Sequence, residues 1–357
     1  MTHKSKIWKG VVVGILGGLV ASPVFAVEII TRDDIVNNVV KKDQLVRVAD
    51  NAILFLDTSS STNDKFMDTD KPVVRVVKNE LKNRNEYFPD IGHNIGIYTY
   101  TDWQENLPVQ PYNRDNVAAA LDTMRDRGSG PTPLKIGLQK LDGILKPLSG
   151  RTAVFVFWDG EYTGQNPAEV AKQLAQKYDV CFYVISSAKP KREATLTQDV
   201  ATLNSCSRVI PLADFVNRPE YTSGALYDVK VTDQVVTSTD TKIVGLKVDD
   251  INFATNKTAL AAEDKADLDK VAEFMKDKPK SYAKIAGYTD NVGSRDHNEG
   301  LSRDRAKMVA SYLKSRGVDD SRMMLFWYGP TNPKVANDSP ANQAMNRRVE
   351  LAVGLGE

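Results

Sequence analysis

The chain has 357 residues, of which 41% are hydrophobic and 26% are charged, and its formal net charge is +1. This composition is typical of a globular protein, and the length favours two or three domains over a single one. The near balance of acidic and basic residues excludes a strongly basic protein, so we expect no nucleic-acid partner.

Residues 1–26 have the layout of a secretory signal peptide, in which basic residues precede an apolar run and a cleavage site. The apolar run is shorter than the roughly 20 residues that cross a bilayer. We therefore expect cleavage after Ala26, a mature chain with no membrane span, and a mature net charge of −2. The alternative is an uncleaved inner-membrane anchor. The features in order are Lys4, Lys6 and Lys9, the apolar run from Val11 to Ala21, and the side chains of Val24 and Ala26.

The cysteines and histidines are few. Cys181 and Cys206 are the only cysteines, and in an exported protein such a pair typically closes a disulfide. Two buried free thiols are the alternative. His93 and His297 are the only histidines after the signal, and neither stands beside a plausible nucleophile. A Ser–His or Cys–His catalytic mechanism therefore has little support.

From residue 27 onward the chain divides by pattern. In residues 27–50, Ile35, Val39 and Val40 are spaced as in an amphipathic helix, which predicts a helical lead-in. In residues 51–217, apolar runs alternate with helical patterns. Runs of this kind indicate strands that are covered on both faces, and we expect an open, mostly parallel α/β sheet with helices on both faces. The predicted strands are Ala52–Leu56, Ile95–Tyr100, Ala153–Trp158 and Cys181–Ile185.

Residues 218–245 contain the polar stretch "TSTDT" and predict a linker. Residues 246–355 predict a second, smaller domain. Its first helix has apolar residues at positions 268, 271, 272 and 275, which is helical spacing. A strand at 283–289, a helix at about 298–315 and strands at 325–327 and 348–353 follow.

Oxygen-bearing side chains follow the strands of the first domain. Asp57, Ser59 and Ser61 form D-x-S-x-S after one predicted strand, Asp159 ends another, and Thr132 lies in the turn "GSGPTPL" before a helix. Because the carboxyl ends of parallel strands lie at the same edge of a sheet, we expect these side chains to lie close together. Carboxylates and hydroxyls suit Mg²⁺ or Ca²⁺ better than zinc or copper. The alternative is that these side chains only hydrogen-bond to one another and tie the loops together.

In this order, the five residues resemble the metal-ion-dependent adhesion site of the von Willebrand factor type A domain. The resemblance implies Mg²⁺, or another hard divalent cation such as Ca²⁺ or Mn²⁺, with one coordination position left open for a carboxylate of a protein partner. Two positions depart from the family pattern. Pro131 precedes Thr132 where the family has glycine, and Trp158 replaces a threonine before Asp159.

The second domain carries an arginine on the apolar face of a helix. Leu301, Arg305 and Val309 are spaced by four residues, and a buried arginine needs a carboxylate partner. Asp290, which closes the preceding strand, is one candidate. An internal salt bridge between Asp290 and Arg305 is therefore one alternative for this pair, and a binding site is the other.

The segments "INFATNKTAL", "AGYTDNVGS", "NEGLSRDRAKMVASYL" and "NRRVEL" resemble the OmpA-like peptidoglycan-binding domain from about Val248 to Val353. This resemblance implies an α+β domain with a mixed sheet and two helices on one face. It also implies that Asp290 and Arg305 grip diaminopimelate in the peptidoglycan stem peptide, since this zwitterion needs a carboxylate for its ammonium and a planar fork for its carboxylate. Asn298 is alternatively only a helix N-cap. Further matching positions are Thr289, Asn256, Asn298 and Arg348.

Together, these features predict an exported, periplasmic binding protein associated with the cell wall or the outer membrane, and not an enzyme. One domain holds peptidoglycan, and the other presents its metal site to a protein carboxylate. A metal-dependent hydrolase is one alternative, although no motif supplies a general base. A structural or motor-associated component anchored in the inner membrane is the other.

Overall fold

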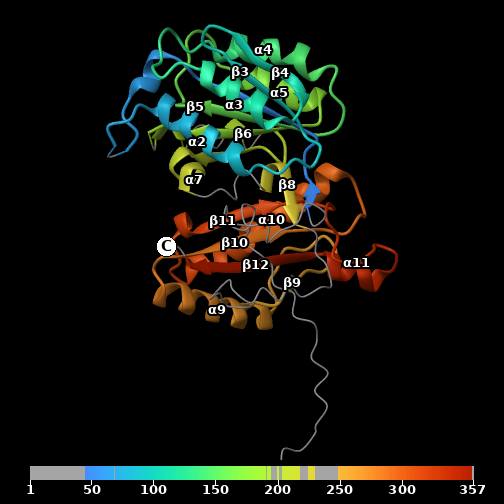
Figure 1. Cartoon of the computed structure of the whole chain (residues 1–357). Coiled ribbons are helices and arrows are strands. Elements are labelled where there is room, and N and C mark those ends of the chain that lie inside the picture. Colours follow the sequence, from blue (N-terminus) through green and yellow to red (C-terminus); the bar gives the residue numbers. More distant parts are fainter. Residues whose placement is uncertain are drawn as a thin grey trace, which may run out of the picture.

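The computed structural model describes residues 45–67, 69–189, 191–193, 199–200, 203–217, 224–229 and 248–355. The predicted signal peptide, residues 27–44 of the lead-in and most of the predicted linker lie outside the described residues. The described elements form two domains that lie one above the other in Figure 1. Within the described part of the chain, no helix is both long and apolar enough to cross a membrane.

The N-terminal domain is built on a six-stranded sheet with the order β4-β3-β2-β5-β6-β7. All neighbouring strands are parallel except β3 and β4, which confirms the predicted mostly parallel sheet. Every residue of β2, β5 and β6 is buried. The strands are β2 (Asn51–Leu56), β3 (Asn94–Thr99), β4 (Gln104–Pro111), β5 (Thr152–Trp158), β6 (Val180–Ser186) and β7 (Arg208–Pro211).

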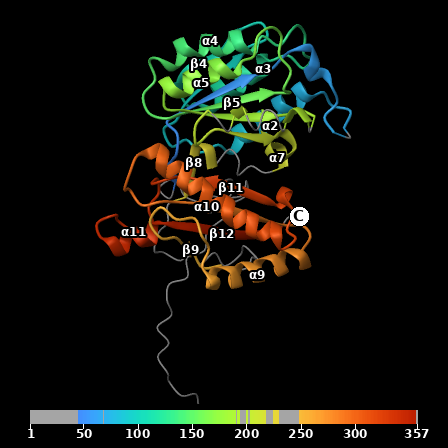
Figure 2. The same cartoon turned by 180° about the vertical axis from the view of Figure 1, so that it is seen from behind.

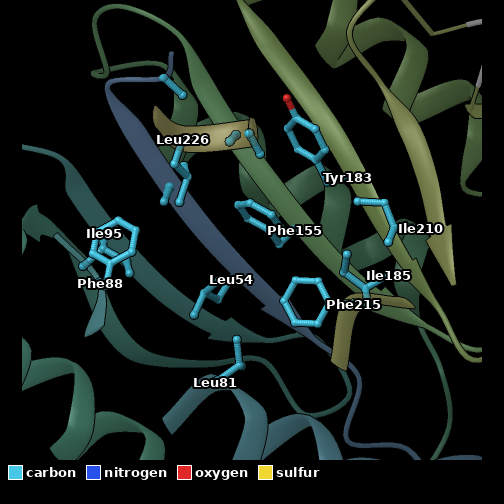
Figure 3. Packing of buried hydrophobic residues seen from close by; sticks show 14 of the residues in the cluster. Leu54, Leu81, Phe88, Ile95, Phe155, Tyr183, Ile185, Ile210, Phe215 and Leu226 are labelled. Carbon is cyan, nitrogen blue, oxygen red and sulfur yellow. The ribbon is translucent and has the colours of Figure 1, made fainter. Parts of the chain in front are cut away.

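Helices cover both faces of this sheet, as predicted. Leu54 and Leu56 of β2 point to one face, and the intervening Ile53 and Phe55 point to the other. The first face packs on α2, α3 and α7, and its apolar core includes Leu81, Phe155 and Phe215 (Figure 3). The second face packs on α4 and α5. The helices are α2 (Val73–Tyr87), α3 (Arg114–Thr123), α4 (Leu134–Leu145), α5 (Ala168–Lys177) and α7 (Leu212–Asn217), with a short 3-10 turn η2 (Ser60–Asn63).

The C-terminal domain has a four-stranded sheet with the order β11-β10-β12-β9. Since β10 pairs in parallel with β11 and antiparallel with β12, the sheet is mixed. Helices α9 and α10 lie over one face (Figure 2), where their apolar residues share a core with β10 and β12. The elements are β9 (Ile251–Asn252), α9 (Ala262–Asp277), β10 (Ser281–Gly287), α10 (Arg295–Ser315), η3 (Asp320–Arg322), β11 (Met323–Trp327), α11 (Pro340–Asn346) and β12 (Arg348–Leu355).

Two short strands fall in segments for which we expected other structure. Leu45–Arg47, at the end of the expected helical lead-in, form β1, and Tyr227–Val229, inside the expected linker, form β8. The helical expectation for Leu45–Arg47 is wrong. These residues pair antiparallel with β8, and the Val48 amide then donates to the Leu226 carbonyl at 2.8 Å. A partner strand more than 170 residues later decides the structure here, and a local pattern cannot reveal it.

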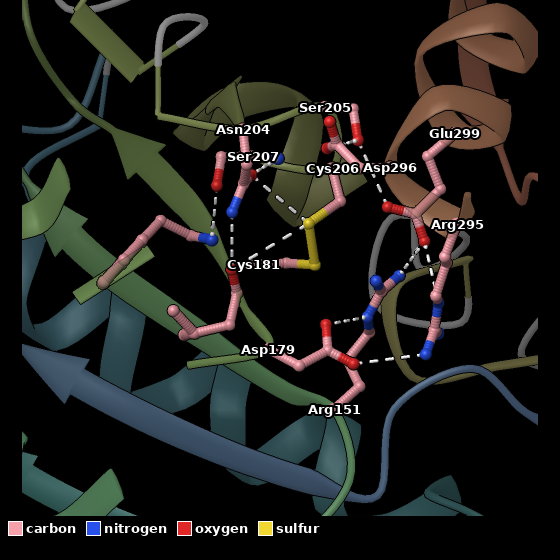
Figure 4. Close-up of a disulfide and its surroundings, with 12 residues drawn as sticks. Arg151, Asp179, Cys181, Asn204, Ser205, Cys206, Ser207, Arg295, Asp296 and Glu299 are labelled. Atoms are coloured by element: carbon pink, nitrogen blue, oxygen red, sulfur yellow. Dashed lines mark hydrogen bonds and ion pairs between the residues drawn. A yellow bond between two sulfur atoms is a disulfide. The ribbon is translucent and has the colours of Figure 1, made fainter. Parts of the chain in front are cut away.

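A disulfide joins Cys181 at the start of β6 to Cys206, with their Cα atoms 5.4 Å apart. This confirms the predicted pairing. The bond fixes the turn before β7 to its neighbouring strand. Figure 4 shows this turn beside the first residues of α10, which belong to the other domain.

Candidate binding sites

The first candidate site lies at the carboxyl edge of the large sheet. Asp57 directly follows β2 and Asp159 directly follows β5, and these two strands are parallel neighbours. Both aspartates line one small cavity. The structure therefore brings the two predicted carboxylates together.

Asp57 is almost fully buried, with 6% of its surface exposed. Its Oδ1 accepts a hydrogen bond from the Ser59 amide at 2.8 Å, whereas its Oδ2 is buried and has no hydrogen-bond partner among the described residues. Burial raises the pKa of Asp57 to about 6 against the lowering effect of Ser59, and the negative charge of Asp159 raises it further. An ionised Asp57 thus lacks a neutralising partner.

Two loops carry the predicted hydroxyl ligands to this edge. The Ser59 and Ser61 hydroxyls lie 2.9 Å apart. The loop that contains Thr132 packs on the turn that carries these serines, since the Ser60 amide donates to the Gly130 carbonyl at 3.0 Å. At Gly128 a Cβ atom would lie 1.9 Å from the Ser59 carbonyl oxygen, so only glycine permits this approach.

Thr132 is also tied to the loop after Asp159. Its amide donates to the Thr163 hydroxyl at 3.1 Å, and its carbonyl accepts from the Thr163 amide at 2.8 Å. Of the two departures from the family pattern, Trp158 packs in the core under α4 and α5, and its indole N–H donates to the Glu161 carbonyl. All three chain segments of the predicted site therefore meet at one sheet edge.

The donor set fits a hard divalent cation. A buried carboxylate oxygen without a partner is the type of group that a cation would satisfy, and hydroxyl oxygens are suitable further ligands. The described residues contain no group of three or more His, Cys, Asp and Glu side chains that could hold a metal ion. A cation here would thus depend on two carboxylates and on hydroxyls. The residues that would hold it are Asp57, Ser59, Ser61, Thr132 and Asp159.

The second candidate site surrounds Arg305 of α10, whose side chain is fully buried. Its guanidinium donates to the carbonyls of Lys257, Tyr288 and Ala254 at 3.0, 3.1 and 3.2 Å. No carboxylate of the described residues lies within 4.0 Å of it in an ion pair, so the Asp290–Arg305 salt bridge that was the alternative to a binding site is not formed. Burial lowers the pKa of Arg305 to about 10, and the charge of Arg347 adds to this effect.

Asp290 instead pairs with Arg347, with 2.9 Å between Oδ2 and the guanidinium. We call Asp290, Arg305 and Arg347 the arginine cluster. It contains two positive charges and one negative charge, so its net charge is +1. The sequence pattern did not single out Arg347, and the only signal for it was the arginine pair in "NRRVEL".

Three other predicted residues lie around this cluster. Thr289 is buried, and its hydroxyl donates to the Asp290 carbonyl at 2.8 Å. Asn298 is not the N-cap of α10, because Ser294 holds that position. The Asn298 amide side chain donates to the Val292 carbonyl at 3.1 Å and so supports the loop that carries Asp290. Asn256 is exposed and lies 3.3 Å from the His297 ring.

The structure does not bring Arg348 to the arginine cluster. Its side chain is fully buried, pairs with Glu350 at 2.6 Å and lies over the Tyr288 ring at 3.9 Å. Neighbouring residues of a strand point to opposite faces. Since Val349 faces α9 and α10, Arg348 lies on the other face of the sheet.

Comparison with known families identifies both domains of the chain. Residues 51–218 match the von Willebrand factor type A domain, and residues 252–347 match the OmpA family. The chain carries a von Willebrand factor type A domain followed by an OmpA domain. In the A domain, the parallel sheet edge described above holds Asp57 and Asp159. The OmpA domain holds the arginine cluster.

Several curated proteins are similar to part of this chain. "Peptidoglycan-binding protein ArfA" of Mycobacterium tuberculosis (strain CDC 1551 / Oshkosh) is 41% identical over 103 residues, which are 29% of this chain and 32% of that protein. "Probable lipoprotein YiaD" of Escherichia coli (strain K12) is 36% identical over 118 residues, 33% of this chain and 54% of that protein. "Peptidoglycan-associated lipoprotein" of Legionella pneumophila is 36% identical over 99 residues, 28% of this chain and 56% of that protein. The chain therefore spans between about a third and just over half of the length of these relatives.

Proposed function

We propose that the protein is an exported, periplasmic binding protein that holds peptidoglycan through its OmpA domain and presents a metal-dependent adhesion site through its A domain. The proposed ligand of the OmpA domain is the diaminopimelate residue of the stem peptide. The proposed ligand of the A domain is a carboxylate of another protein. Both roles are binding roles without catalysis, and they place the protein at the cell wall or the outer membrane.

The observation that carries the first role is the net positive charge of the arginine cluster. A fully buried Arg305 without an acidic partner is costly unless a carboxylate arrives. Diaminopimelate brings a carboxylate and an ammonium on the same carbon. The ammonium would take the place of Arg347 beside Asp290, and the carboxylate would then bind the released guanidinium of Arg347 and the guanidinium of Arg305.

Similarity to proteins whose names describe peptidoglycan binding or association supports this role. The geometry supports it too, since Asp290 and Arg347 keep 8% and 14% of their side chains exposed and Asn256 is exposed nearby. A ligand can therefore reach the internal ion pair first. In this proposal, opening of that pair gives the ligand access to Arg305.

Co-sedimentation with purified, diaminopimelate-containing cell walls tests the first role. The full chain should sediment with the walls, and Arg305→Ala should reduce binding at least tenfold, because a charged hydrogen-bonding partner of a buried carboxylate contributes about 1.5–3 kcal/mol. Arg303→Ala is the matched control, since Arg303 lies on the same helix, is partly exposed and pairs with Asp304. Equal sedimentation of the Arg305 and Arg303 variants would contradict the proposal.

For the second role, the proposed cation is Mg²⁺ or another hard divalent ion. Bound there, the ion would neutralise Asp57 and supply an open coordination position for a partner carboxylate. The chain's own contribution is to hold the two carboxylates and the hydroxyls at one edge, through the loop contacts of Gly128 and Thr132 described above.

Calorimetric titration with Mg²⁺ or Mn²⁺ tests this second role. We expect the full chain to take up one ion and Ser61→Ala to bind it at least tenfold more weakly, since it loses a predicted ligand. Ser60→Ala is the matched control, because Ser60 is adjacent and exposed and is not part of D-x-S-x-S. No uptake by the unaltered chain, or equal loss in both variants, would refute the metal site.

A further inference from the structure

The two domains meet at the amino edge of the large sheet, which is the edge opposite to Asp57 and Asp159. Arg151 immediately precedes β5 and Asp179 immediately precedes β6. Both contact the first turns of α10, from which Arg295 and Glu299 reach across the interface (Figure 4). One domain thus touches the helix that carries Arg305 in the other.

Four charged side chains form a closed cluster at this interface. Arg151 lies 2.5 Å from Glu299 and 3.0 Å from Asp179, and Arg295 lies 3.1 Å from each of these two acids. The cluster is electrically neutral, with two positive and two negative charges. We call these four residues the interface charge cluster.

Two members of this cluster are buried, whereas the side chains of Arg295 and Asp179 keep 45% and 42% of their surface exposed. Arg151 is 8% exposed and Glu299 is 3% exposed. Burial disfavours the charged form of Arg151, but Glu299 and Asp179 outweigh this effect and raise its pKa. Removing one member of a buried pair leaves a charge without compensation. The cluster therefore favours one fixed position of α10.

The turn before β7 adds contacts that the disulfide holds in place. The Ser205 hydroxyl lies 3.0 Å from Asp296 and 3.2 Å from Glu299, and the Ser205 carbonyl accepts from the Trp327 indole at 2.8 Å. Cys206, next in the chain, is bonded to Cys181 of β6. The disulfide thus fixes a loop of the A domain that contacts both α10 and β11.

The contacted turn of α10 is continuous with the arginine cluster. Asn298, next to Glu299, donates to the Val292 carbonyl, and the Val292 amide donates to the Asp290 carboxylate at 3.2 Å. One turn on, the Ser302 hydroxyl accepts from the Gly329 amide at 3.0 Å, and the Gly329 carbonyl accepts from the Thr289 amide at 2.8 Å. The position of the first turns of α10 therefore sets the position of the Asp290 loop.

We propose that Arg151 and Asp179 of the A domain are positioning residues for the peptidoglycan site of the OmpA domain. They hold the first turns of α10, and through Asn298 they hold the Asp290 loop in one position, so that only the Asp290–Arg347 pair has to open for the ligand. Pre-organisation of this kind raises affinity because less ordering remains for the binding step. The inference rests on the proposed peptidoglycan binding, and it adds that the A domain positions the residues that bind peptidoglycan.

The test uses the full chain with Arg151→Gln, which keeps a polar side chain and removes the charge at the interface. Calorimetry with a synthetic stem peptide that ends in meso-diaminopimelate measures affinity below the melting transition. Hydrogen–deuterium exchange of residues 289–299 measures the order of the loop. We expect at least about fivefold weaker binding, in the usual range of coupling between sites, together with faster exchange in this segment.

Lys177→Gln is the matched control, since it breaks an exposed ion pair with Asp142 inside the A domain. It should change neither affinity nor exchange. The double variant Cys181→Ser, Cys206→Ser keeps every charge of the interface and releases the Ser205 turn from β6. We expect it to change affinity and exchange in the same direction as Arg151→Gln, and it serves as the second variant if Arg151→Gln does not fold.

The outcomes separate the two proposals. If the unaltered chain does not bind the stem peptide, the proposed function fails and the inference fails with it. If the unaltered chain binds and Arg151→Gln binds equally well, only the inference is overturned, whether or not the exchange rate changes. A lower melting temperature with unchanged affinity would likewise show a merely structural role for Arg151 and overturn the inference.

Discussion

At Asp57 a carboxyl group is buried beside a second carboxylate, and one of its oxygens has no hydrogen-bond partner among the described residues. Its pKa of about 6 lies above the ordinary value of 3.8, chiefly because of burial. The folded chain thus binds the Asp57 proton more tightly than the unfolded chain does. Burial therefore disfavours the ionised form of Asp57, which is the form that binds a cation, when no cation is bound.

This predicts how the stability of the metal-free protein depends on pH. The contribution of Asp57 to stability should be greatest when Asp57 is protonated, fall as the pH rises from about 4 to about 6, and level off above that. The difference in pKa corresponds to about 3 kcal/mol in the free energy of unfolding. In chelator, Asp57→Asn should therefore be more stable than the unaltered chain at pH 7 and equally stable at pH 4.

Denaturant titrations at several pH values with chelator measure this. Parallel curves for the two proteins from pH 4 to pH 7 would contradict the assignment of the raised pKa to Asp57. Adding Mg²⁺ at pH 7 should stabilise the unaltered chain and leave Asp57→Asn unchanged, because the ion binds the ionised carboxylate.

Individual residues also mark the limit of inference from sequence. The spacing of Asp57, Ser59, Ser61, Thr132 and Asp159 placed them at one sheet edge, since parallel strands align their ends. The spacing of Asp290 and Arg305 suggested a direct contact, but Arg347 takes the aspartate instead. Arg347 and Arg348 are adjacent, and whether each points into the site depends on where β12 begins. A sequence pattern does not fix that to one residue.

Among the elements, the buried ones were predictable and the peripheral ones were not. The sequence predicted that the central strands are buried, because nearly continuous apolar residues form β2, β3, β5 and β6. β4 is the antiparallel edge strand with the polar sequence "QENLPVQP", and its Pro108 is tolerated only at an edge or an irregularity. β1 and β8 have three residues each and exist because they pair with each other.

Helix α10 contributes both to the core of the OmpA domain and to the interface between the two domains. Its apolar face, with Val309 and Leu313, packs on the sheet of the OmpA domain, which the helical spacing in the sequence predicted. Its first turns carry Arg295, Asp296 and Glu299 to the A domain. As a sequence this stretch is an ordinary polar helix start, and only its tertiary partner gives it another role.

At the scale of the whole molecule, the two domains share an apolar core as well as the charge cluster. Phe326 and Tyr328 of the OmpA domain belong to the same buried cluster as Phe155 and Tyr183 of the A domain, and Leu226 of the connecting segment belongs to it too. Asp228 is buried there and accepts from the Tyr288 hydroxyl at 3.1 Å. The sequence did not indicate this docking, because Arg151, Asp179 and Glu299 look like solvated surface charges until both domains are folded.

The contact between the domains also fixes where the two candidate binding sites lie relative to each other. The OmpA domain contacts the amino edge of the A-domain sheet, while the candidate metal site lies at the carboxyl edge, one seven-residue strand away along β5. Seven strand residues span roughly 20 Å. A chain held to the wall by α10 and its neighbours would thus present the metal edge on the side away from that contact.

The central claim is that the arginine cluster binds a zwitterion, and one comparison tests it most directly. Two synthetic stem peptides, one with meso-diaminopimelate and one with lysine at the same position, differ by a single carboxylate at the end of the side chain. Calorimetric titration of the full chain should give binding to the first and at least tenfold weaker binding to the second, because only the first offers a carboxylate to Arg305. Equal affinity for both peptides would contradict the account.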